Sequence, residues 1–171
     1  MSREKCNVVV GVDNGLDGGL VALSEYTGHV LEKRPMPTRT MGKKREIDPF
    51  AVRDWLLSLN ENPRKVLFAI EEPLKHAKNS QAMRSMGISF GLLHGTGELS
   101  GLRVERVQVG DWQPLLLGRV PKGRTKEYAL KKATELWPYE NWLASSRCSV
   151  PHDGMVDAAL VAQYARLKLL S

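Results

Sequence analysis

Four acidic residues stand where the chain is predicted to end a strand or to begin a helix. They are Asp13, Glu71, Asp153 and Asp157. A carboxylate taken out of water at the end of a buried strand is costly in free energy unless a cation compensates it. Carboxylate oxygens are the ligands that hard divalent cations prefer, and a pair of such cations is the apparatus of phosphodiester hydrolysis. We therefore expect these four acids to hold two divalent ions in a hydrolase.

Three of these acids also have a structural interpretation to weigh. Asp13 precedes a glycine-rich turn, where its side chain can accept a hydrogen bond from the backbone of Gly15, and both interpretations stay open. Asp153 opens a helix, and a carboxylate there is stabilised by the helix dipole. Asp157 sits one turn further in, beside the apolar stripe, so capping explains it poorly.

Runs of apolar residues predict the strands that carry the first two acids. The β-branched run 8–12 is typical of a strand buried on both faces, and residues 20–23 follow as the second arm of a hairpin. Residues 65–72 predict another buried strand, in which Glu72 points to the opposite face from Glu71 and ranks second to it. Further strands are predicted at 28–36 and 102–109. In open α/β sheets, sites form beyond the carboxyl ends of such strands.

Helices are predicted between and after these strands, which makes this an α/β protein. Asp48 followed by Pro49 is a strong helix start, and the helix extends to Leu59. Residues 110–118 are expected to form a short connection in which Trp112 anchors the core. The other helices are predicted at 80–99, at 126–137 and after Pro151, the last with an inner face of Val156, Ala159, Leu160, Gln163 and Leu167.

Three glycines at a spacing of four fall on one face of the helix at 80–99. They are Gly87, Gly91 and Gly95. Such a face permits close approach of another backbone. We favour packing against the protein's own sheet, and a homodimer interface is the alternative. The charged residues Arg84 and Glu98 exclude a membrane-spanning interpretation.

The chain carries a net charge of +6, with an isoelectric point near 9.4, which favours a polyanionic partner. Two basic stretches stand out. The polar stretch 38–46 is either a solvated loop or a phosphate contact made by Arg39, Lys43, Lys44 and Arg45. The second stretch surrounds Gly123 and contains Lys122, Arg124 and Lys126.

The 171 residues are enough for one compact domain. No apolar run is long enough to span a membrane, and the charged N-terminus leading into a strand argues against a secretory signal. Cys6 and Cys148 have no zinc-ligand spacing, so reduced cytoplasmic thiols are expected. We expect a cytoplasmic protein with no membrane partner and no small-molecule cofactor.

The motifs around the acids resemble a known family. GVDNG at 11–15, AIEEP at 69–73 and HDGMVDAALVA at 152–162 match, in order and spacing, the RuvC-like Holliday junction resolvases of the ribonuclease H-like superfamily. The resemblance covers most of the chain, including the glycine-bearing helix and the basic stretch before the penultimate helix. In length and style the chain looks like a phage- or prophage-type member.

This resemblance implies a five-stranded mixed sheet flanked by helices, and a homodimer that grips a four-way DNA junction and nicks opposed strands. It also implies Mg²⁺ or Mn²⁺, two ions per active site, carried by the four acids. The family's dimer contact falls on the helix from Gly87 to Gly95. Its functional lysine corresponds to Lys126, with Lys122 and Arg124 nearby on the DNA side.

The chain departs from the family's pattern at two places. Asn14 stands where bacterial members commonly have proline, and Asp153 and Asp157 are four residues apart where the family's last two ligands are three apart. Because some members use histidine at the penultimate ligand position, His152 competes with Asp153 for that role. An exposed position at the helix entry is the structural interpretation of His152.

Competing functions remain at this stage. An RNA or RNA–DNA hybrid nuclease would use the same four acids. The segment GVDNGLDGG also resembles the first phosphate loop of the actin and sugar-kinase group, although that group needs two such domains and has no role for the late acidic pair. A third possibility is a DNA-binding scaffold without catalysis, which retention of all four acids argues against.

Overall fold

The computed structural model describes residues 6–73 and 79–170, and its centre is a five-stranded mixed sheet in the order β3-β2-β1-β6-β7. Its strands are β1 (Val8–Asp13), β2 (Gly19–Ser24), β3 (Val30–Pro35), β6 (Val66–Glu71) and β7 (Arg103–Val107). β1 pairs antiparallel with β2 and parallel with β6. The predicted hairpin and the predicted five-stranded sheet are both confirmed.

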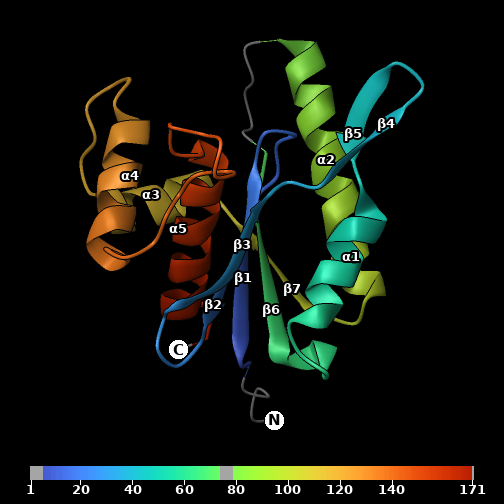
Figure 1. Cartoon of the computed structure of the whole chain (residues 1–171), viewed down its shortest axis with the longest axis horizontal. Coiled ribbons are helices and arrows are strands. Elements are labelled where there is room, and N and C mark those ends of the chain that lie inside the picture. The colour runs from blue at the N-terminus through green and yellow to red at the C-terminus, as the bar shows by residue number, and fades with distance from the viewer. Residues whose placement is uncertain (1–5, 74–78, 171) are drawn as a thin grey trace.

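Helices cover both faces of this sheet (Figure 1). One face carries α3 (Val109–Leu117), α4 (Thr125–Leu136) and α5 (Asp153–Lys168), and the other carries α1 (Pro49–Ser58) and α2 (Ser80–Leu99). A short 3-10 turn, η1 (Pro63–Lys65), precedes β6. Each face of the sheet has its own apolar core, so β1 and β6 are buried on both sides. This explains their continuous apolar sequence.

The helix starts follow the sequence in most places. Asp48 caps α1 by accepting hydrogen bonds from the backbone N–H groups of Phe50 (3.0 Å) and Ala51 (3.1 Å). The predicted bounds of α2 are those observed. In α5 the expected inner face is buried except for Leu167, which is 43% exposed.

The structure of the segment after β7 differs from our prediction. Residues 109–117 form the helix α3 and not the short connection that we expected. Trp112 is nevertheless fully buried, as the core-anchor prediction requires.

The basic stretch 38–46 is a regular element and not the solvated loop of our first interpretation. It forms a two-stranded hairpin of β4 (Thr38–Met41) and β5 (Lys44–Ile47), which projects away from the main sheet at the upper right of Figure 1. Arg39 pairs with Glu46 across the hairpin at 2.8 Å, and Arg45 pairs with Asp17 in the β1–β2 turn. The alternating pattern of a strand was hidden because its side chains are nearly all polar.

The preferred interpretation of the glycine face is wrong. A Cβ atom added at Gly87, Gly91 or Gly95 would meet nothing within 4 Å, so these glycines do not pack against the protein's own sheet. The close contact is made instead by Gly97, whose added Cβ would lie 2.7 Å from the ring of Phe68. The periodicity identified the face of the helix, but it could not identify what lies opposite.

Within the described residues, no helix is long and apolar enough to cross a membrane. The charged N-terminal residues 1–5, on which the absence of a secretory signal was predicted, lie outside the described residues.

Candidate active site

Asp13 and Glu71 end neighbouring parallel strands. β1 and β6 pair up to Val12 and Ile70, so the two acids follow side by side at the same edge of the sheet. The side-chain amide of Asn14 donates a hydrogen bond to the backbone carbonyl of Glu71 (2.5 Å), which ties the two strand ends together. Asp13 Oδ1 also accepts a hydrogen bond from the N–H of Gly15 (3.3 Å), so the predicted local turn is present.

Glycines let the start of α5 approach these strand ends at backbone distance. Gly18 in the β1–β2 turn forms an isolated parallel bridge with Gly154. A Cβ added at Gly154 would lie 2.5 Å from the Cα of Gly18, and one added at Gly11 would lie 2.0 Å from the carbonyl oxygen of Ala158. Any side chain at Gly11 or Gly154 would therefore push α5 away from β1. This close packing brings Asp157, on the first turns of α5, to the acids of the sheet.

The buried acids repel one another. Burial and the charges of Asp13 and Asp157 together raise the pKa of Glu71 to about 8, although a hydrogen bond from Trp112 lowers it. Burial, together with repulsion from Asp13 and Asp153, raises the pKa of Asp157 to about 7. The pKa of Asp13 is raised by burial as well. These three carboxylates form one electrostatic cluster, which an added cation would stabilise.

Asp153 differs from the other three acids because its side chain is 50% exposed. Its Oδ2 accepts a hydrogen bond from Lys126 Nζ at 2.5 Å, and this bond raises the pKa of Lys126. Lys126 lies on the first turn of α4, so the basic stretch predicted to face DNA reaches the edge of the acidic cluster.

His152 is the N-cap of α5. Its Nδ1 accepts a hydrogen bond from the N–H of Met155 (3.2 Å), and the described residues give its Nε2 no hydrogen bond. The charge of His152 lowers the pKa of Asp13, so the ring stands near the cluster. Both candidates for the penultimate ligand are thus close to Asp13, and the choice between them stays open.

The carboxylate oxygens of the cluster are the kind of ligand that divalent cations prefer, but the side chains are not arranged around a common metal position. Carboxylate oxygens without sulfur ligands suit Mg²⁺ or Mn²⁺. As the side chains lie, however, no group of three or more His, Cys, Asp or Glu in the described ranges could hold a metal ion. Lys126 engages Asp153, whereas Trp112 engages only one carboxylate oxygen of Glu71. Cation binding by Asp153 therefore requires Lys126 to leave this carboxylate.

The predicted phosphate-binding residues form two groups, which are exposed except for the half-buried Arg39. Lys122 and Arg124 lie in the turn before α4, where Arg124 pairs with Glu127. The second group, on the β4–β5 hairpin, consists of Arg39, Lys43, Lys44 and Arg45. Within residues 6–73 and 79–170, the structure gives no ion-pair partner to Lys43, Lys44 or Lys122, which leaves their charges available to a ligand.

Sequence reasoning missed two contacts at Glu71. Trp112 was predicted as a core residue, and its indole N–H in fact donates to Glu71 Oε2 at 2.7 Å. Asn14 was noted only as a departure from a family pattern, and it is the buried side chain that joins β1 to β6. Both bonds join residues 41 or more positions apart, and no local sequence pattern predicts such contacts.

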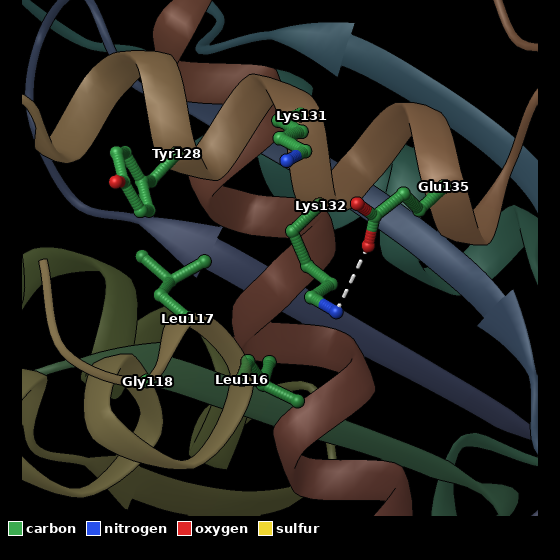
Figure 2. A pocket seen from close by; sticks show the side chains of 7 residues that line it. All are labelled: Leu116, Leu117, Gly118, Tyr128, Lys131, Lys132 and Glu135. Atoms are coloured by element: carbon green, nitrogen blue, oxygen red, sulfur yellow. Dashed lines mark hydrogen bonds and ion pairs between the residues drawn. The ribbon is translucent and has the colours of Figure 1, made fainter.

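The pocket in Figure 2 does not contain the acids. It is an open hollow of about 350 Å³ between the end of α3 and the outer face of α4. It is lined by Leu116, Leu117, Gly118, Tyr128, Lys131, Lys132 and Glu135, with Lys132 paired to Glu135 at 3.1 Å. The acidic cluster is instead a surface site at the edge of the sheet.

The five-stranded mixed sheet with helices on both faces defines a ribonuclease H-like α/β fold. Two solved structures of Thermus thermophilus RuvC share this fold. One, described as RuvC in complex with a Holliday junction substrate, matches with a TM-score of 0.62 and 15% identity over 95% of this chain and 96% of that chain. The other, of RuvC, matches with a TM-score of 0.55 and 17% identity over 92% of this chain and 94% of that chain.

The chain matches no protein-family model and no curated protein sequence. The likeness to RuvC therefore lies in the fold, and the role of each acidic residue rests on the geometry of this chain.

Proposed function

We propose that this protein is a structure-selective endonuclease that resolves four-way (Holliday) DNA junctions with the help of divalent metal ions. The observation that carries the proposal is the cluster of Asp13, Glu71 and Asp157. Three mutually repelling, largely buried carboxylates destabilise a protein unless they serve a cation, and they lie in a fold shared with RuvC over nearly the whole chain.

In this proposal Asp13, Glu71 and Asp157 hold two Mg²⁺ or Mn²⁺ ions, with Asp153 or His152 as the further ligand. When bound, the ions supply an activated water and stabilise the leaving oxygen of the phosphodiester. The protein's own contribution is to hold the carboxylates on two rigid strand ends and one helix. Lys126, released from Asp153, is then positioned to neutralise the scissile phosphate.

The exposed cations supply the DNA-binding surface. Lys126 contacts Asp153, Lys122 and Arg124 lie in the turn before α4, and the β4–β5 hairpin presents exposed Lys43 and Lys44. Contacts of this kind give affinity through phosphates, so binding weakens with salt and depends on the shape of the DNA. Two groups of cations suit a branched substrate that offers several strands.

We further propose that the protein acts as a homodimer through the glycine face of α2. Gly91 and Gly95 line an open groove of about 410 Å³ between α1 and α2, whose wall includes exposed Phe50 and the 93% exposed Leu99. Exposed apolar side chains beside a face of small residues favour the close approach of a second copy.

Light scattering at micromolar concentration tests the dimer. The wild type is expected to be a dimer and Gly91→Arg a monomer. Gly110→Arg is the matched control, because Gly110 is also a helical glycine with open space around its Cβ. A wild-type monomer would contradict this part of the proposal.

The function itself is tested by cleavage of a labelled four-way junction beside a linear duplex and an RNA–DNA hybrid. We expect symmetric nicking of the junction alone, abolished by chelator and by Asp13→Asn. Cleavage of the hybrid instead would move the function to RNA. Intact junction binding with no cleavage of any substrate would leave a binding protein and refute the nuclease.

A further inference from the structure

Trp112 contacts the acidic cluster from a helix that carries none of the acids. The residue lies on α3, its side chain is fully buried, and its indole Nε1 donates to Glu71 Oε2 at 2.7 Å. An indole N–H can only donate, so this oxygen must act as the acceptor. A buried donor aimed at a carboxylate fixes the orientation of that carboxylate.

The other three tryptophans do not serve the cluster. Trp55 donates to Glu32 (2.7 Å), and Trp137 donates to the backbone carbonyl of Gly28 (2.8 Å). The indole nitrogen of Trp142 is buried and has no hydrogen-bond partner within the described residues. A buried indole in this fold thus tolerates a backbone partner or none, so packing alone does not require the bond to Glu71.

Glu71 is held at two points along its length. Asn14 binds its backbone carbonyl (2.5 Å), and Trp112 binds one oxygen of its carboxylate. Together these contacts fix where the strand ends and which way the side chain turns. The indole engages Oε2 and leaves Oε1 outside this bond, and the charges of Asp13 and Asp157 act on the same carboxyl group.

We propose that Trp112 is a positioning residue, whose indole N–H holds the Glu71 carboxylate in the orientation that binds a divalent cation. The inference rests on the proposed function of the cluster. Hydrogen-bond donors that orient a metal-binding carboxylate are worth about 10- to 100-fold in metal affinity. Trp112 therefore acts through Glu71 and does not itself touch the metal or the DNA.

The test uses the whole chain with Trp112→Phe, which keeps an aromatic ring in the core but removes the donor. Trp137→Phe is the matched control, because it removes an equally buried indole bond far from the acids. Calorimetric titration with Mn²⁺ in the absence of DNA should show affinity weakened about 10- to 100-fold in Trp112→Phe. We expect the affinity of Trp137→Phe to stay within about twofold of wild type.

An NMR spectrum of the indole N–H groups reports the contact directly. The Trp112 resonance, identified by its loss in Trp112→Phe, should shift in Glu71→Gln and upon addition of Mg²⁺, while that of Trp137 stays in place. A merely structural role for Trp112 would leave its resonance insensitive to Mg²⁺. If Trp112→Phe fails to fold, replacement of Trp112 by 3-benzothienylalanine removes the N–H from a ring of the same shape.

The outcomes separate this inference from the proposed function. If the wild type binds Mn²⁺ and cuts junctions, and the folded variant without the N–H binds Mn²⁺ within twofold of wild type, the positioning role is overturned and the nuclease stands. If the wild type binds no Mn²⁺, both fail. If Mn²⁺ binding weakens as expected but no DNA substrate is cut, the positioning role stands and the nuclease assignment fails.

Discussion

Replacing Glu71 with glutamine should stabilise the metal-free protein at alkaline pH. Burial and the neighbouring acids raise the pKa of Glu71 from its ordinary 4.5 to about 8. The unfolded chain therefore loses this proton near pH 4.5, whereas the folded chain keeps it until about pH 8. The folded state binds more protons in this window, so its stability falls as the pH rises through it. Glutamine removes the titration and still accepts a hydrogen bond from Trp112.

The size of the effect follows from the shift. A difference of 3.5 between 8 and 4.5 corresponds to about 5 kcal/mol when the group is fully ionised, and to about 4 kcal/mol at pH 8, where half of it is. Water entering the site and side-chain rotation relieve part of this repulsion. We therefore expect Glu71→Gln to gain about 2 to 4 kcal/mol over wild type at pH 8 and about zero at pH 4.5.

Urea unfolding in the presence of chelator, followed at pH 4.5, 6, 7 and 8, measures this gain. Glu61→Gln is the control, because Glu61 is an exposed carboxylate outside the cluster. Its difference from wild type should stay near zero throughout. A difference for Glu71→Gln that does not grow with pH would refute the raised pKa of Glu71. Adding Mn²⁺ should reverse the order, because the wild type gains stability from the cation and the variant gains little.

Three further predictions concern packing and DNA contact. Asn14→Ala should lower the free energy of unfolding by about 1 to 3 kcal/mol, measured by urea unfolding, because the carbonyl of Glu71 loses its buried partner. Gly11→Ala should cost about 3 kcal/mol or more in the same assay, since the new Cβ would clash with Ala158, whereas Gly110→Ala should be neutral or slightly stabilising. Lys122→Ala should weaken junction binding and reduce the slope of log affinity against log salt by about 1; an unchanged slope would place Lys122 away from DNA.

The positions of Asp13 and Glu71 were predictable because each follows an unbroken apolar run. Such a run predicts a buried strand, and an acid at its carboxyl end must then lie at the edge of the sheet where sites form. The capped start of α1 was predictable for a similar reason, since Asp48 and Pro49 act locally. A sequence pattern confined to one element predicts that element correctly when no tertiary contact opposes it.

Features that depend on two distant segments were not predictable. The spacing of Gly87, Gly91 and Gly95 identified a face of α2 but not its surroundings, and the face turned out to be open. The bond from Trp112 to Glu71 joins residues 41 positions apart, so no sequence periodicity could predict it. The close approach of Gly154 to Gly18 depends on how α5 enters the fold. The sequence thus predicted that Asp13 and Glu71 end buried strands, while the contacts that orient the acids required the structure.

The most direct test of the account is to locate Mn²⁺ in crystals of the protein by anomalous scattering. We predict two peaks at the carboxyl ends of β1 and β6, bound by Asp13, Glu71 and Asp157, with Asp153 or His152 completing the set and Lys126 turned away from Asp153. Peaks only at other sites, or an acidic cluster without metal at millimolar Mn²⁺, would contradict the central claim that these carboxylates form a metal-dependent active site.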